Sequence, residues 1–424
     1  MILQEHKLRR DLIAELHARP TELLQSPVQI SYLALVSAGT AKADEWRHLC
    51  TLLNAYGVVT SPEPLAHASH DLGPFRVKYE RHSEFARYLF IAPLTAERPF
   101  AEVALAQVPR DWLDGLVGEV ITAMHVEVRT EISPADDLAL AVDAFDGEPL
   151  VGVEIGDGAA RAMTHCRVED DGFGRLILFD RELTPRQTGR MVQRLLEIDT
   201  YRMMALLALP IARELAPFLS DCDKELAEVT SLLATATSRD ESALLYRLTR
   251  LEASIENRIT RNEFRFGAAM AYNDLVTRRI DELREQRITG FAPFKEFNDR
   301  RLAPAIATCQ TVVRRQESLS ARVARANELL ATRIDVTLEE QNQELLASLN
   351  QRASTQLRLQ QTVEGLSVVA ITYYAVNLIG DMAKAISTEV HHLEPEVVMG
   401  LSVPVVMALA ALAVRRIRRS VNRD

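Results

Sequence analysis

Apolar residues are spread unevenly along this chain, and two long stretches without charge lie near its end, at Gly365–Gly380 and Val397–Val414. A helix needs about 20 apolar residues to cross the hydrocarbon core of a bilayer, and about 17 suffice. The second stretch meets this length, and the first does so if its helix continues beyond Asp381. The pattern predicts a transmembrane hairpin at residues 365–414 with an external loop at 381–396. Two core helices of a soluble protein are the alternative.

Charged residues around the hairpin predict its orientation. Arg352 and Arg358 precede it, and the loop is acidic, with Lys384 as its single basic residue. A basic tail at 415–424 follows, and the predicted membrane anchor consists of Arg415, Arg416, Arg418 and Arg419. Because Lys and Arg collect on the cytoplasmic side of membrane helices, we expect both chain ends in the cytoplasm. The location expected is the bacterial inner (cytoplasmic) membrane.

Residues 1–183 read as a cytoplasmic α+β domain with a mixed or antiparallel sheet. Short β-branched or aromatic runs, bounded by turns such as Asp146-Gly147, favour strands. The predicted strands are Val28–Val36, Phe75–Tyr79, Tyr88–Ala92, Thr122–Val128, Leu138–Val142, Leu150–Ile155 and Leu176–Phe179. Helices are expected at Glu5–Ala18 and Ala41–Tyr56.

Residues 184–364 read as a helical bundle and stalk, because Gly and Pro become sparse while Leu, Ala, Arg and Glu dominate. The predicted helices are Arg186–Leu209, Asp221–Thr235, Glu241–Ile288 and Phe294 to about Ala385, the last interrupted at most near Pro304. Leu319, Val323, Ala326 and Leu330 follow coiled-coil spacing, and the apolar pattern then continues with slips. The pattern predicts a loose bundle that packs against itself or against other copies, and hence a homo-oligomer.

Composition narrows the classes of function. A hydrophobic content of 47% is ordinary for a globular chain and too low for a transporter with many spans. A net charge of −10 argues against nucleic acid as a partner. The four cysteines form no CxxC pair, and His67, His70 and Asp71 lack a second cluster that would complete a zinc set. We expect no cofactor, and the lipid bilayer and other copies as partners.

One face of the first apolar helix carries polar residues at a spacing of seven, which places them nearly in line. This polar stripe consists of Gln360, Ser367, Tyr374 and Asp381, with Asn377 beside it. Polar side chains in a membrane usually face a bundle interior or a water-filled path. They either line a pore around an oligomer axis or join helices by hydrogen bonds.

The external loop gathers carboxylates and imidazoles, namely Glu389, His391, His392, Glu394 and Glu396. A ring of such groups would concentrate cations at a pore mouth. The alternative is a solvated loop that keeps the hairpin from sliding through the bilayer. The chain has no GxxxxGK[ST] and no GxSxG motif, and we find no nucleophile or general base in it. The sequence therefore predicts no enzyme and no catalytic residue.

Several stretches resemble an uncharacterised bacterial family of predicted membrane-anchored proteins, a domain of unknown function. They span almost the whole chain: Ala14–Pro20, Asp71–Arg76, Glu80–Phe85, Leu195–Leu207 and Leu357–Ser367. The resemblance implies membrane anchoring and brings no established activity.

A second resemblance is one of layout. A cytoplasmic α/β domain, long stalk helices and a C-terminal two-helix hairpin are similar to CorA-type divalent-cation channels, which are pentamers. Those proteins carry Gly-Met-Asn at the outer end of the first membrane helix, where this chain has Gly380-Asp381-Met382. The first hypothesis is thus an oligomeric membrane-anchored protein whose cytoplasmic domain binds a ligand or partner. The alternative is a CorA-like divalent-cation channel or transporter gated by that domain.

Overall fold

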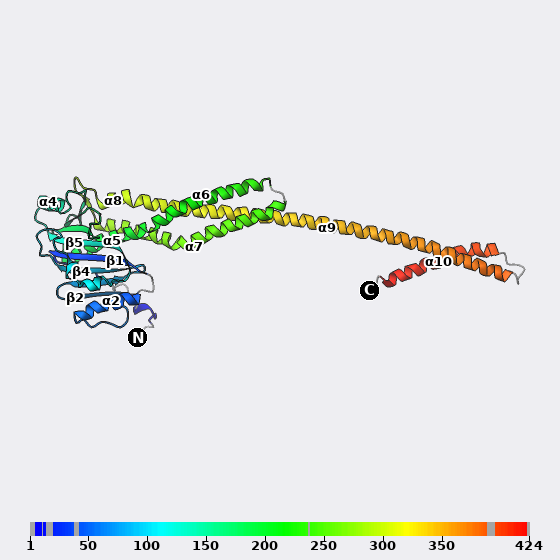
Figure 1. Cartoon of the computed structure of the whole chain (residues 1–424), viewed down its shortest axis with the longest axis horizontal. Coiled ribbons are helices and arrows are strands. Elements are labelled where there is room, and N and C mark those ends of the chain that lie inside the picture. Colours follow the sequence, from blue (N-terminus) through cyan, green and yellow to red (C-terminus); the bar gives the residue numbers. More distant parts are fainter. Residues whose placement is uncertain are drawn as a thin grey trace. The chain divides into compact units, whose positions relative to one another are not determined.

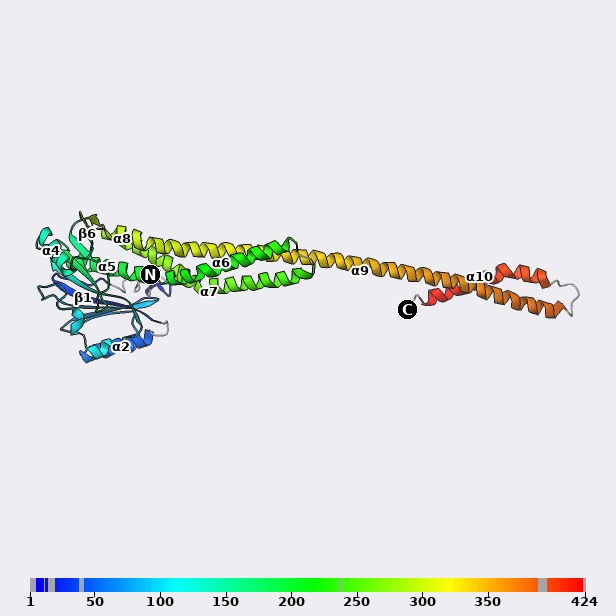
Figure 2. The same cartoon turned by 45° about the horizontal axis from the view of Figure 1, so that its top comes forward.

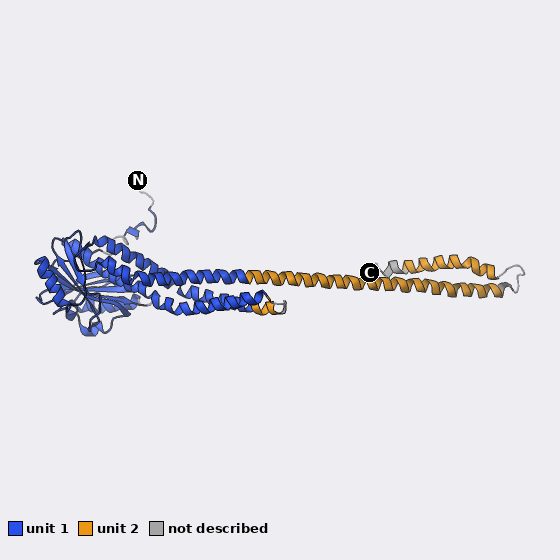
Figure 3. Ribbon diagram, turned by 90° about the horizontal axis from the view of Figure 1, so that it is seen from above, with its two compact units in different colours: residues 1–234, 246–326 blue, residues 235–245, 327–424 orange. Residues whose placement is uncertain are grey.

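The computed structural model of the chain describes residues 5–10, 12–13, 20–37, 42–235, 238–387 and 395–421. The chain divides into two compact units (Figure 3). Unit 1 comprises residues 1–234 and 246–326, and unit 2 comprises residues 235–245 and 327–424. The domain boundaries expected at 183 and 364 stay predictions.

Unit 1 contains one mixed sheet of nine strands within the described residues, in the order β2-β3-β4-β1-β5-β8-β7-β6-β9. Every neighbouring pair is antiparallel except β5 and β8, which run parallel. The strands are β1 (Val28–Val36), β2 (His67–Asp71), β3 (Arg76–Arg81), β4 (Phe85–Pro93), β5 (Glu119–Thr130), β6 (Val151–Ile155), β7 (Ala160–Thr164), β8 (Gly174–Asp180) and β9 (Gln286–Arg287). A mixed sheet followed by long helices confirms the predicted α+β class.

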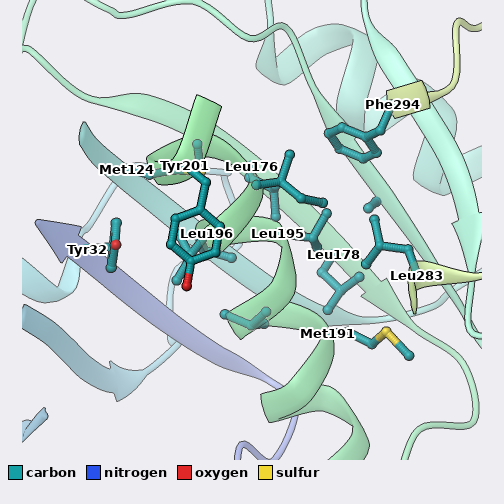
Figure 4. Packing of buried hydrophobic residues seen from close by; sticks show 14 of the residues in the cluster. Tyr32, Met124, Leu176, Leu178, Met191, Leu195, Leu196, Tyr201, Leu283 and Phe294 are labelled. Atoms are coloured by element: carbon teal, nitrogen blue, oxygen red, sulfur yellow. The ribbon is translucent and has the colours of Figure 1, made fainter. Parts of the chain in front are cut away.

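Both faces of the sheet are covered by helices (Figures 1 and 2). Successive side chains of a strand point to opposite faces, so Tyr32 of β1 lies in one core while Leu33 lies in the other. On the Leu33 face lie α2 (Lys42–Ala55), the 3₁₀ turn η2 (Ala104–Gln107) and α3 (Arg110–Leu113). On the Tyr32 face lies α5 (Pro185–Leu206), whose Leu195 and Leu196 pack on the strands (Figure 4).

The predicted strand Leu138–Val142 is wrong, because this segment lies in α4 (Pro134–Ala144). Ser133 is the N-cap and accepts a hydrogen bond from the backbone N–H of Asp136, while Pro134 occupies the first turn. Both features start helices. The N-cap and Pro134 therefore favour a helix here, although the short apolar run that follows is also compatible with a strand.

Helices α6 (Ala208–Leu233) and α7 (Ser238–Leu283) precede β9 in the sequence, and helices α8 (Phe294–Arg301), α9 (Ala303–Ser387) and α10 (Pro395–Val421) follow it. The predicted gap between Leu209 and Asp221 is wrong. Pro210 lies in the first turn of α6, where a missing N–H costs no helical hydrogen bond, and Pro217 lies inside the helix.

In unit 1, α6, α7 and α9 form a bundle with apolar contacts inside and ion pairs outside. Leu219 of α6, Ile255 of α7 and Val323 of α9 are fully buried. Asp223 of α6 accepts hydrogen bonds from two arginines of α9, Arg315 at 2.8 Å and Arg322 at 2.7 Å. Exposed pairs of this kind contribute little to stability, so the apolar contacts hold the bundle together.

Candidate functional site

Two helices of unit 2, the C-terminal part of α9 and α10, pack against each other as a hairpin. Their contact is narrow: among the described residues of this part of the chain, Thr372, Val376 and Gly380 of α9 and Ala410 of α10 are buried. Gly380 permits the closest approach, because a Cβ there would lie 2.4 Å from the sulfur of Met399. Large apolar side chains on the remaining faces, such as Leu366 and Leu409, are more than 60% exposed.

Within the described part of the chain, three helical stretches are long and apolar enough to cross a membrane: Pro185–Leu233, Phe294–Ala385 and Glu396–Arg416. In their most apolar windows, 33%, 17% and 6% of the residues are buried, respectively. The first stretch uses its apolar residues inside unit 1, because Leu195 packs on the sheet and Leu219 lies inside the bundle. The other two stretches leave most of their apolar residues exposed. In water this exposure costs free energy, whereas in a bilayer lipid would cover these residues.

The polar stripe lies mostly on the side of α9 that α10 leaves open. Tyr374 is 73% exposed, and Asp381 makes a 3.6 Å ion pair with Lys384 one turn further on. Gln360 is exposed, whereas Ser367 and Asn377 are half-buried. The structure thus places Gln360, Tyr374 and Asp381 on the open face of α9, and it covers Ser367 and Asn377 in part.

The predicted loop residues Glu389, His391, His392 and Glu394 lie outside the described residues. Glu396 lies in the first turn of α10. Arg415 and Arg416 are exposed near the end of the same helix. Arg418 and Arg419 belong to α10 as well, although their side chains lie outside the described part.

Unit 1 contains a feature that the sequence reasoning missed: a layer of buried charge between the sheet and helices α5 and α7. We call Lys78, Glu80, Arg87, Glu197 and Arg279 the charged layer. Lys78 of β3 lies 3.1 Å from Glu80, which pairs with Arg87 of β4, and Arg87 donates to Glu197 of α5 at 3.1 Å. Arg279 of α7 pairs with the second carboxylate oxygen of Glu197.

Electrostatics of the charged layer keep its carboxylates ionised. Burial disfavours the charged form of Glu197, but Arg87 and Arg279 outweigh burial and hold the pKa below its usual value. Burial opposes ionisation of Glu80 as well, and Arg87 and Lys78 likewise lower its pKa. Burial and the nearby Glu197 raise the pKa of Tyr201 to about 12, so this phenol stays neutral. The layer is an ordered set of ion pairs rather than an acid–base pair tuned for proton transfer.

The sequence shows only the strand part of this layer. Lys78 and Glu80 alternate with Val77 and Tyr79, as expected of a strand with one polar and one apolar face. Since a solvated face is the usual reading of such alternation, the sequence alone does not indicate that α5 covers these charges.

A second polar group lies on the opposite face of the sheet, around His125 of β5. Its Nδ1 is 2.8 Å from the Ser31 hydroxyl, and its Nε2 is 4.0 Å from Asp171. Ser, His and Asp are also the residues of a nucleophilic triad, but a triad histidine faces the serine with Nε2 and the aspartate with Nδ1, the reverse of the arrangement here. Moreover, Ser31 is fully buried, and its oxygen accepts a hydrogen bond from the backbone N–H of Leu105. The group therefore holds η2 on the sheet and offers no access to a substrate.

A basic pocket lies between α5 and the end of α7, on the face of the sheet that α5 covers. Its volume is about 500 Å³, and Arg190, Arg194, Arg278 and Arg284 line it together with Asp281 and Glu282. Arg194 pairs with Glu282 at 3.1 Å, and Arg284 pairs with Asp157. These pairs neutralise much of the positive charge. Among the described residues, no three His, Cys, Asp or Glu side chains are grouped as a metal site would require.

The fold and the hairpin define an α+β protein with a candidate membrane anchor. The chain belongs to a family of proteins of unknown function, DUF3422, whose pattern it matches over residues 4–421. The match confirms the resemblance to an uncharacterised family. No curated protein and no solved structure matches the chain.

Proposed function

We propose that this chain is an inner-membrane protein anchored by the hairpin of α9 and α10, with its sheet domain in the cytoplasm. The observation that carries the proposal is the exposed apolar surface of the hairpin next to the basic end of α10. A water-facing surface of this kind is unfavourable, whereas a bilayer is a suitable environment. The proposal includes self-association and assigns no catalytic activity.

The function of such a protein would be to hold a rigid cytoplasmic domain at the membrane and present it to a ligand or partner. Both faces of the central sheet are covered, and its charges are satisfied internally by the charged layer. A binding surface on unit 1 would therefore lie on loops or helix surfaces rather than on the sheet itself. The basic pocket beside α5 is one such surface.

Arginine substitutions in the hairpin test the anchor. Leu401 and Leu409 of α10 are 68% and 62% exposed, and each change to Arg would cost about 3 kcal/mol in a bilayer. We expect the double variant to be extracted from membranes by alkaline carbonate, whereas the wild type stays. The matched control is the same pair of changes at Leu329 and Val336, which are also exposed but lie outside the apolar stretches. Retention of the Leu401/Leu409 variant, or equal release of the control, would contradict the anchor.

Thiol labelling tests the orientation. Glu396→Cys should react with a membrane-impermeant maleimide in intact cells, and Arg416→Cys only after permeabilisation. The unaltered chain, with its four cysteines, provides the background. The reverse labelling pattern would place the sheet domain outside.

A cation channel is the second candidate, because Tyr374 and Asp381 lie on the face of α9 that α10 leaves open. In a ring of copies, this face would line an axis, as the layout resemblance to CorA-type channels implies. Asp381→Ala should then reduce divalent-cation flux in vesicles with assembly intact, whereas Thr372→Ala, buried in the hairpin, should not. An assembled protein without flux would remove this candidate and leave the anchor in place.

A further inference from the structure

A segment of α9 in unit 2 is helical without any cover. Every residue from 338 to 363 is exposed, although several are large and apolar. An isolated helix gains little from backbone hydrogen bonding in water, and most helices are stabilised by packing of an apolar face. This segment therefore needs a packing partner.

The exposed apolar residues of this segment follow one heptad pattern. Between residues 336 and 366 they are Val336, Leu338, Leu345, Leu346, Leu349, Leu357, Leu359, Val363 and Leu366. Six of these nine occupy alternating spacings of four and three residues, the a and d positions of a coiled coil: Leu338, Leu345, Leu349, Leu359, Val363 and Leu366. Two of the seven heptad positions are a and d, so random placement would put about two or three of the nine there in any given register. The stalk seam consists of these six residues together with Asn342, Arg352 and Gln356 at the remaining a and d positions.

The polar members of the stalk seam indicate which partner fits it. Asn342 and Gln356 each carry an amide that both donates and accepts hydrogen bonds. Such a group is satisfied by the same amide of an identical helix lying parallel and in register, and an Asn at an a position is a known determinant of that register. An unrelated apolar helix would leave both amides unpaired, which costs free energy.

The position of the stalk seam along the chain points to the same partner. The seam ends at Leu366, one residue inside the apolar stretch that begins at Gly365. A partner must therefore approach the membrane at the same depth while presenting a matching heptad pattern. A second copy of α9, anchored by its own hairpin, meets both conditions.

We infer that Leu338–Leu366 of α9 pairs with the same segment of a second copy as a parallel, in-register coiled coil. This inference rests on the proposed function, because the shared membrane anchor sets the parallel orientation and the register. Arg352 is the unfavourable member of the seam, since two guanidinium groups approach each other at a d position.

Cysteine cross-linking in native membranes tests the seam. Asn342→Cys replaces an a position, so the two copies should be joined by a short bismaleimide linker. Glu340→Cys, two residues away on the outer face, is the matched control and should stay unlinked. The unaltered chain provides the background of the four native cysteines. Equal linking at both positions, or none at Asn342→Cys, would overturn the inference.

A gain of association provides a second test that does not depend on a destabilised variant. Arg352→Leu removes the like-charge contact and should strengthen the dimer about tenfold, measured by native mass spectrometry on dilution in detergent. Arg358→Leu is the matched control, because Arg358 occupies an outward c position of the same helix. An equal effect of both changes, or no effect of Arg352→Leu, would count against the seam.

Failure of the inference and failure of the proposed function are distinguishable. An oligomeric wild type without cross-linking at Asn342→Cys would mean that copies associate elsewhere, with the proposal for the anchor intact. A wild type released from membranes by carbonate would overturn the anchor itself.

Discussion

Replacing Glu197 by glutamine tests the charged layer with little change in volume. Glu197 is 3% exposed and accepts hydrogen bonds from Arg87 at 3.1 Å and from Gln193 at 2.7 Å, in addition to its pair with Arg279. The amide of glutamine keeps one acceptor oxygen and places an N–H₂ group against one of the arginines. The guanidinium groups of Arg87 and Arg279 then lose the negative charge that both of them contact.

The structure gives the expected magnitude. Removing one partner of a buried ion pair costs about 3–5 kcal/mol, and one retained hydrogen bond returns about 1 kcal/mol. Arg87 keeps Glu80, and Arg279 keeps Glu282 at 2.9 Å. We therefore expect Glu197→Gln to lower the free energy of unfolding of the sheet domain by about 2–3 kcal/mol.

Urea unfolding of the full chain in detergent measures this loss. Trp46 and Trp112 are the two tryptophans of the chain, and both are buried against the sheet, so their fluorescence reports on the sheet domain. The control is Glu214→Gln, whose carboxylate is 75% exposed and pairs with Arg258 at 3.3 Å. It should cost less than about 0.5 kcal/mol. A cost for Glu197→Gln as small as that of the control would refute the reasoning.

The same comparison has a pH dependence with a defined sign. Because the folded pKa of Glu197 lies below its unfolded value of about 4.3, its contribution is complete above that pH. It is lost as the pH falls through the folded pKa. The difference between the wild type and Glu197→Gln should therefore be full at neutral pH and shrink below about pH 4.

Two further changes test other features of unit 1. Gly189→Ala should destabilise the sheet domain by about 1–3 kcal/mol, because its Cβ would lie 1.8 Å from the backbone oxygen of Glu22. Gly267→Ala has no atom within 4 Å of its Cβ and should instead stabilise α7 by about 0.5–1 kcal/mol; urea titration measures both. Burial and the charge of Arg175 lower the pKa of His125 to about 4, so unfolding takes up a proton between about pH 6.5 and 4. As the pH falls through this window, the free energy of unfolding of the wild type should decrease by about 1.4 kcal/mol per pH unit. His125→Asn should remove this part of the pH dependence. An unchanged slope in the variant would contradict the lowered pKa of His125.

The sequence predicted those parts of the fold whose pattern is local and regular. The strand Val28–Val36 was predicted with the bounds of β1, because β-branched and aromatic residues alternate with Gln29 and Ser31 and an apolar run follows them. β2 (His67–Asp71) and β7 (Ala160–Thr164) were missed, since neither HASHD nor ARAMT has the composition of a strand. Both strands form because neighbouring strands pair with them, which is a tertiary effect.

Of the two candidate sites, the one with a local sequence pattern was predicted, and the one formed by tertiary contacts was missed. The polar stripe was visible because residues seven apart share a helix face, whatever the helix packs against. The charged layer was not, because Glu80 and Glu197 are more than 100 residues apart and meet only when α5 covers the sheet. Proximity of this kind depends on topology, which periodicity does not reveal.

The last strand of the sheet has a consequence for synthesis. β9 pairs with β6 through Val153 and Arg287, so about 130 residues, including α5, α6 and α7, are made between the two partners. At a synthesis rate of about 5–20 residues per second, the edge of β6 stays unpaired for roughly 7–27 seconds during translation. An unpaired edge strand is prone to pair with other chains. Nascent chains that stall before residue 286 would therefore expose an aggregation-prone edge at β6. The apolar stretches beyond residue 365 are synthesised after β9, so all strands of the sheet have been made before the proposed membrane anchor.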